Sequence, residues 1–260
     1  MSDFPAMEPC IFDPLRFYDP RSAAVRAAVA VSACLTGEKV RYDGADKLLP
    51  AYSILKTELA LIPICPEVGA GLTIPRPPVQ LMQTETGVRA VGRDKPALDI
   101  TGALQQFAEI SLQQLTGTRA LCGYLWKSRS PSCGLDSTPL FNASGCEIDR
   151  ISGIQSAYFQ RELPWLNYCE DTVVESATSA MRFVLQCRLV FDLLYTSATS
   201  SLKMLHQHYS FLHSHFNWHT QDQLETLSNA EIKTDYLAAL LNACNQMPED
   251  ELLSLFKWRT

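Results

Sequence analysis

Residues 27–34 read Ala-Ala-Val-Ala-Val-Ser-Ala-Cys, an almost unbroken apolar run that ends at a cysteine. Two further runs have the same form: residues 60–64 (Ala-Leu-Ile-Pro-Ile) lead to Cys65, and residues 120–126 (Ala-Leu-Cys-Gly-Tyr-Leu-Trp) lead toward Cys133. Continuous apolar runs without alternation are typical of strands buried on both faces, as in parallel sheets covered by helices. The pattern therefore predicts a parallel sheet that contains these three strands.

A helix is predicted between the second and the third run. Asp99 or Thr101 can cap its N-terminus, and Gly117 is a residue type at which helices commonly end. Between them, side chains recur at helical spacing and form an inner stripe: Leu104, Phe107, Ala108, Ser111 or Leu112, and Leu115. Strands that alternate with helices predict an α/β fold, Rossmann-like and with a mostly parallel sheet.

The pattern changes near residue 164. Apolar residues recur at helical spacing in three later segments, at about 181–194, 202–218 and 236–256. We therefore expect an N-terminal extension (1–26), an α/β domain (27–163) and a C-terminal all-helical domain (164–260).

Composition indicates an intracellular enzyme. The chain has 260 residues and 47% hydrophobic content, enough for a full core, and its net charge of −6 gives no general attraction to DNA or to an anionic membrane. Its nine cysteines are odd in number, scattered and without paired spacing, which argues against a secreted disulfide framework. The apolar run 23–35 contains Arg26 and is too short to span a bilayer. We expect a cytoplasmic protein without a membrane partner.

Three of the cysteines are candidate metal ligands. In open α/β sheets, ligands bind at the carboxyl ends of the strands, so Cys34, Cys65 and Cys133 are expected to converge at one edge. Three thiolates leave a position on the metal open for substrate, as catalytic sites do. The alternative is that these cysteines are small buried apolar residues.

Four motifs in series closely resemble those of the thiouracil desulfidase family. They are VSACLTGEKVRYDG (31–44), CPEVGAGLTIPRPP (65–78), DIT (99–101) and KSRSPSCG (127–134). The resemblance covers roughly residues 27 to 155. One departure is Thr36, where the family usually has leucine.

The resemblance implies a cofactor and two catalytic residues. The cofactor is a [4Fe-4S] cluster held by Cys34, Cys65 and Cys133, whose fourth iron binds the sulfur of a thiocarbonyl substrate. Glu67 and Ser130 are implied as the groups that assist hydrolytic removal of that sulfur.

This chemistry is physically consistent. A soft metal with an open position prefers sulfur, and binding it withdraws electron density from the adjacent carbon. Glu67 would then take a proton from an attacking water that Ser130 positions, and no net electron transfer is needed. The alternatives are that Glu67 is a solvated carboxylate beside a Pro turn and that Ser130 stabilises a Ser-Pro corner.

Several polar residues of the same motifs are predicted to contact a pyrimidine substrate: Arg41, Asp43, Lys47, Arg76 and Ser132. An ordinary Asp-Gly turn at residues 43–44 and a rigid loop at residues 75–78 are the structural alternatives.

The substrate class implied is a thiolated pyrimidine: thiouracil or 4-thiouridine, free or within tRNA. The tail loosely resembles the helical domain that follows the desulfidase domain in tRNA 4-thiouridine desulfidases, which implies tRNA as a partner. Acidic residues outnumber basic ones from residue 165 onward, however, which is unlike a phosphate-binding module. A protein-docking role for the tail, and a non-catalytic metal-binding or redox-sensing protein that uses the same three cysteines, are the alternatives.

Overall fold

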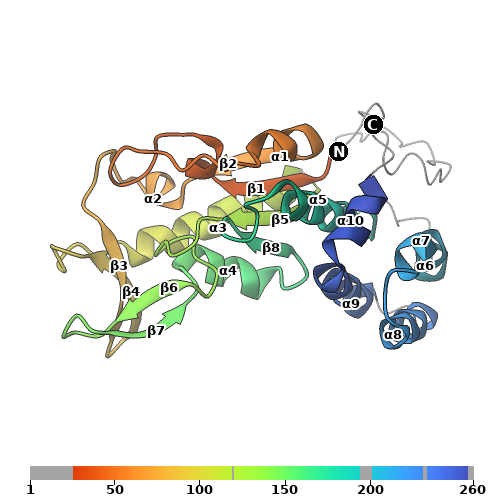
Figure 1. The fold of residues 1–260 in the computed structure, drawn as a ribbon. Coiled ribbons are helices and arrows are strands. Elements are labelled where there is room, and N and C mark those ends of the chain that lie inside the picture. Colours follow the sequence, from red (N-terminus) through yellow and green to blue (C-terminus); the bar gives the residue numbers. More distant parts are fainter. Residues whose placement is uncertain (1–25, 119, 194–200, 231–232, 257–260) are drawn as a thin grey trace, which may run out of the picture.

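The structure is a computed structural model that describes residues 26–118, 120–193, 201–230 and 233–256. Nearly all of the expected N-terminal extension, residues 1–25, lies outside the described residues. Figure 1 shows a central sheet between helices, a second sheet at one end of the molecule and a group of helices at the other.

The central sheet contains the three predicted strands and is entirely parallel. Its strands are β1 (Ala28–Ser32), β2 (Ala60–Ile64), β5 (Leu121–Trp126) and β8 (Asn167–Glu170), in the order β2-β1-β5-β8. Every residue of β1 and of β5 is buried, as expected for continuous apolar runs. The predicted α/β class is confirmed.

Helices cover both faces of this sheet. Val29 and Val31 of β1 pack in one apolar cluster with α1 (Tyr52–Glu58) and α5 (Ala177–Phe191). Ala30 points the other way, into a cluster with α3 (Thr101–Thr118) and α4 (Ile154–Glu162). Successive side chains of a strand face opposite sides of the sheet. A strand that is apolar throughout therefore needs a layer of helices on each face to keep its side chains out of water.

Helix α3 is the helix predicted between the second and third runs. The carboxylate of Asp99 accepts a hydrogen bond of 2.9 Å from the backbone N–H of Thr101 at its start. Its inner stripe includes the buried residues Leu104, Ala108, Ser111 and Leu115. The helix ends at Thr118, just beyond the predicted Gly117.

The sequence analysis did not predict the second sheet. It contains β3 (Val79–Thr84), β4 (Gly87–Gly92), β6 (Thr138–Phe141) and β7 (Glu147–Ile151), in the order β4-β3-β6-β7. Only β3 and β6 pair in parallel. Its apolar face packs on Leu104 of α3 while many of its other residues are polar, so its strands lack the apolar runs that identify β1, β2 and β5.

The region expected to be helical begins with a strand. Strand β8 pairs with β5 and therefore belongs to the central sheet, as α5 belongs to its helical cover. The later helices are α6 (Leu202–His208), α7 (Ser210–His213), α8 (Trp218–Asn229), α9 (Lys233–Gln246) and α10 (Glu249–Phe256). They share one apolar cluster with α1, β1 and α5. The division of the chain into domains 27–163 and 164–260 stays a prediction.

An ion pair also joins the two parts. Arg188 of α5 lies 2.7 Å from the carboxylate of Glu58 on α1, whose side chain is only 7% exposed. A buried carboxylate that loses a cationic partner destabilises the fold, so this pair helps to hold α1 against α5. Within the ranges given above, the structure contains no helix that is long and apolar enough to cross a membrane.

We predict that a chain ending at residue 163 does not fold cooperatively. It lacks β8 and α5, so one edge of β5 and one apolar face of the sheet become exposed to water. Thermal unfolding followed by circular dichroism checks this, with the full chain as control. A soluble monomer of residues 1–163 with a sharp unfolding transition would show instead that the predicted boundary separates two independent domains.

Candidate functional site

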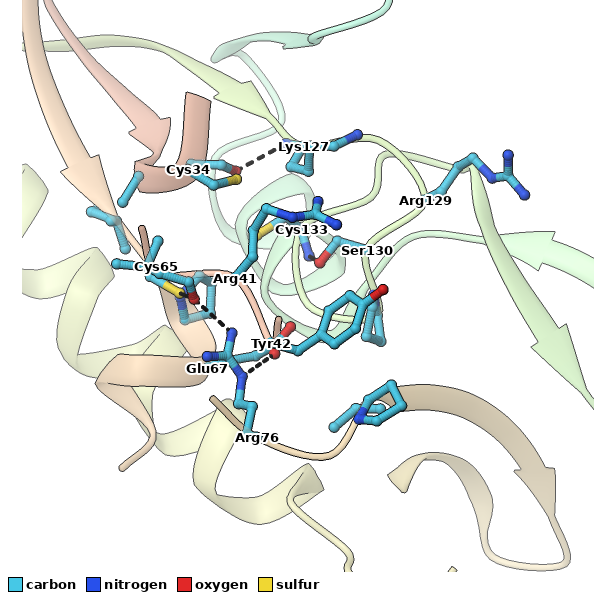
Figure 2. A pocket seen from close by; sticks show the side chains of 18 of the residues that line it. Cys34, Arg41, Tyr42, Cys65, Glu67, Arg76, Lys127, Arg129, Ser130 and Cys133 are labelled. Carbon is cyan, nitrogen blue, oxygen red and sulfur yellow. Dashed lines mark hydrogen bonds and ion pairs between the residues drawn. The ribbon is translucent and has the colours of Figure 1, made fainter. Parts of the chain in front are cut away.

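The three cysteines predicted to be ligands meet at one edge of the central sheet. Cys34 follows β1 on a short 3-10 helix (η2, Ala33–Thr36), Cys65 directly follows β2, and Cys133 lies in the loop after β5. Because β1 pairs in parallel with both β2 and β5, the carboxyl ends of the three strands lie side by side. All three cysteines line one pocket of about 500 Å³ (Figure 2).

A tight turn fixes each cysteine. Gly37 closes the Cys34 turn in a left-handed conformation (φ 91°) that favours glycine. Cys65 precedes the short helix α2 (Pro66–Gly69), and its carbonyl accepts a hydrogen bond of 2.9 Å from the N–H of Gly69. The backbone N–H of Cys133 donates to the hydroxyl oxygen of Ser130 at 3.3 Å. Local backbone geometry thus sets where the thiols lie.

Burial and mutual repulsion favour the neutral thiols. Burial, followed by the charge of Cys65, raises the pKa of Cys34 to about 11. Burial also raises the pKa of Cys65, and it raises that of Cys133 well above the usual range, with the charges of Cys65 and Cys34 adding to the effect. In this state the thiols therefore carry their protons. A soft metal centre that binds them must therefore displace their protons.

Ser130 stabilises the turn that carries Cys133 and also lines the pocket. Its hydroxyl oxygen accepts hydrogen bonds of 3.3 Å from the N–H groups of Ser132 and Cys133. Its carbonyl accepts from Gly134 and from the hydroxyl of Thr138, each at 2.8 Å. Ser130 therefore stabilises the turn, as the structural alternative expects. These contacts do not use its hydroxyl proton, so Ser130 can also donate a hydrogen bond to a ligand in the pocket.

Glu67 lies on α2, in the wall of the same pocket. One carboxylate oxygen is 2.7 Å from Nε of Arg76, and the other accepts a hydrogen bond of 3.2 Å from the hydroxyl of Ser132. Only 13% of the Glu67 side chain is exposed. This excludes the solvated carboxylate that was the alternative.

The structure divides the five residues predicted to contact substrate. Arg41 and Arg76 line the pocket. The other three, Asp43, Lys47 and Ser132, are not among the described residues that line it. The carboxylate of Asp43 lies 3.3 Å from Nε of Arg41, and Ser132 is fully buried behind Glu67. Substrate contact by these residues stays a prediction.

Sequence reasoning did not name three basic residues of the pocket wall: Arg93, Lys127 and Arg129. Lys127 and Arg129 both belong to the quoted motif 127–134, so that motif could have indicated them. Arg93 follows strand β4 of the second sheet, and Arg129 has an unusual positive φ of 60°. Because the second sheet was not predicted, nothing in the sequence placed Arg93 near the cysteines.

The pocket wall is strongly cationic. Among its described residues it has one carboxylate, Glu67, against five basic side chains: Arg41, Arg76, Arg93, Lys127 and Arg129. Lys127 is paired with Asp171 at 2.9 Å. The exposed guanidinium groups of Arg93 and Arg129 make no hydrogen bond or ion pair within the described part of the chain. Such a wall balances three thiolates and attracts an anionic ligand.

The donor set fits a multi-atom centre. In the described ranges, no three histidine, cysteine, aspartate or glutamate side chains are close enough together to hold one metal ion. The thiols of Cys34, Cys65 and Cys133 stand at separate points around the pocket (Figure 2). Iron–sulfur clusters take thiolates at several irons, so their ligands are spaced apart. The chemistry and arrangement of these donors fit such a cluster.

The chain is similar to known proteins in two respects. A family model described as 2-thiouracil desulfurase matches residues 29–171. Among solved structures, the chain is similar to one described as the [4Fe-4S]-dependent thiouracil desulfidase TudS, with 30% sequence identity and a TM-score of 0.46 over 56% of this chain and 92% of that chain. No curated protein matches the chain.

We predict that Gly153→Ala disturbs the Cys133 turn from outside the pocket. A Cβ at Gly153 would lie 2.6 Å from the carbonyl carbon of Ser132 and 2.8 Å from the nitrogen of Cys133, and backbone atoms cannot move aside easily. The free energy of unfolding should fall by about 1–3 kcal/mol. The control is Gly102→Ala, where a Cβ meets nothing within 4 Å. Equal denaturant stability of the two variants would contradict the prediction.

Proposed function

The chain belongs to the 2-thiouracil desulfurase family, and on that basis we propose that it removes sulfur from a thiolated pyrimidine at a [4Fe-4S] cluster. The observation that carries the proposal is the composition of one pocket. Cys34, Cys65 and Cys133 line it together with Glu67 and Ser130. Ligands for a soft metal centre and groups that can move a proton therefore face the same space.

The three thiolates would hold the cluster and leave one iron without a protein ligand. When bound, the cluster supplies a soft Lewis acid that binds a thiocarbonyl sulfur and makes the adjacent carbon more electrophilic. The cationic wall, which includes Arg41 and Lys127, offsets the negative charge of the thiolates.

Glu67 is the proposed general base. Its carboxylate would accept a proton from a water molecule whose oxygen attacks the thiocarbonyl carbon. A C–O bond forms and the C–S bond breaks, so water and the thiocarbonyl give the carbonyl compound and hydrogen sulfide. No electron is gained or lost in this balance. The hydroxyl proton of Ser130 is available to orient the water or to pass a proton to the departing sulfur.

The non-catalytic alternative explains less of the pocket. A metal-storage or redox-sensing protein needs the three cysteines but no positioned acid or base. Glu67 is held by two buried partners at the pocket wall, which is an arrangement expected for a catalytic carboxylate. We therefore favour an enzyme.

The charge of the pocket favours a phosphorylated substrate over a free base. Arg93 and Arg129 are both exposed and both line the pocket, so a phosphate group beside the pyrimidine could pair with them. A 4-thiouridine nucleotide and 4-thiouridine within tRNA both carry such a group. With tRNA as the substrate, activity would fall steeply as salt increases, because phosphate contacts release counterions.

We predict that replacing any of the three ligands with serine removes the cluster. Cys34→Ser, Cys65→Ser and Cys133→Ser should each lose most iron and all release of sulfide from a thiolated pyrimidine, because a hydroxyl is a poor ligand for iron. Iron analysis and sulfide release after anaerobic purification check this. Cys146→Ser is the control, since Cys146 is exposed between β6 and β7 and does not line the pocket. A serine variant that kept its full iron content would remove that residue from the ligand set.

We also predict that Arg93→Gln and Arg129→Gln discriminate between substrates. Each should raise KM for a 4-thiouridine nucleotide about tenfold, because a charge-assisted hydrogen bond to phosphate is lost. KM for 4-thiouracil should stay unchanged, and steady-state kinetics with the two substrates measures both. An equal rise for both substrates, or for neither, would show that these guanidinium groups do not bind a phosphate.

A further inference from the structure

We propose that Arg76 and Ser132 are positioning residues that fix the Glu67 carboxylate, a role beyond the substrate contact predicted from sequence. The inference rests on the proposed function, in which Glu67 is the general base. It assigns to each oxygen of the carboxylate one buried partner from a different part of the chain.

The contacts around Glu67 are shielded from water. Nε of Arg76 lies 2.7 Å from one oxygen, and the hydroxyl of Ser132 lies 3.2 Å from the other. The Arg76 side chain is 4% exposed and Ser132 is 0% exposed. Figure 2 shows Arg76 below the pocket with its guanidinium group directed at Glu67. Partners on both oxygens restrict the carboxylate to one orientation.

The protein holds the guanidinium group of Arg76 at all three of its nitrogens. One terminal nitrogen donates to the carbonyl of Val40 at 2.9 Å, and the other donates to the carbonyl of Thr73 at 3.4 Å. With Nε on Glu67, each of its nitrogens has a protein acceptor. These contacts use three of its five N–H donors, and the side chain is only 4% exposed, so little of the group is open to a substrate.

The same network joins the three segments that carry the thiols. The Val40 carbonyl also lies 3.9 Å from the sulfur of Cys65, in hydrogen-bonding range for a thiol donor. Ser132 directly precedes Cys133, and Val40 belongs to the loop that follows Cys34. The direction of the Glu67 carboxylate is therefore set by the segments that place the ligands. Base and ligands keep one relative geometry, which efficient proton transfer requires.

The test compares Ser132→Ala and Arg76→Lys with Glu67→Gln. Glu67→Gln should lower kcat by a factor of about 100 to 10,000, as expected for loss of a general base. Ser132→Ala and Arg76→Lys should lower kcat about 10- to 100-fold with KM unchanged, since lysine keeps the charge but not the planar fork. Iron content should stay at the level of the unaltered protein in all three variants.

A double variant separates positioning from direct action. In the Glu67→Gln background, Ser132→Ala should change kcat less than about twofold, because its effect acts only through the carboxylate. The matched control is Ser111→Ala: Ser111 is also buried and hydrogen-bonded, but it lies on α3 outside the pocket lining and should leave kcat unchanged.

Two results would overturn the inference, and both can be distinguished from a result that overturns the proposed function. A rise in KM at constant kcat in Ser132→Ala would make Ser132 a substrate contact, and multiplying effects in the double variant would make it act independently of Glu67. If Glu67→Gln itself kept its turnover, the general-base role in the proposed function would fail, and positioning would fail with it. Should Arg76→Lys not fold, Ser132→Ala alone still decides between these outcomes.

Discussion

The parallel pairing of β1 with β2 on one side and β5 on the other is the constraint on which the site depends. Cys34, Cys65 and Cys133 are far apart in the chain, yet each follows one of these three strands. Parallel strands end at the same edge, so the pairing brings the thiols together without any local motif. Helices on both faces bury these apolar strands and hold the sheet in place.

The polar part of the site depends on the same edge. Turns after the strands place Glu67 and Ser130 beside the thiols, and the buried Arg76 connects Glu67 to the segment after Cys34. Buried thiols and a buried carboxylate are costly unless cationic groups and hydrogen bonds compensate them. The basic wall and the Arg76 contacts supply that compensation, so the residues that support the proposed chemistry also stabilise the pocket.

The sequence was sufficient where the apolar pattern is continuous or strictly periodic and insufficient where apolar residues are mixed with polar ones. Strands β1, β2 and β5 and helix α3 are identifiable because their apolar patterns are continuous or strictly periodic. The second sheet was not predicted because its strands have polar outer faces. For the same reason Arg93, which follows one of these strands, was not predicted to line the pocket. The partners of Glu67 could not be derived either. A buried ion pair between residues 67 and 76 depends on loop conformation, which no periodicity encodes.

The central claim is that the three thiols hold a four-iron cluster as the catalytic centre. Its most direct measurement is the iron, acid-labile sulfide and zinc content of the full chain purified without oxygen. The account predicts about four iron and four sulfide ions per chain, with no stoichiometric zinc. Stoichiometric zinc without iron, in a chain that still releases sulfide from a thiolated pyrimidine, would contradict it.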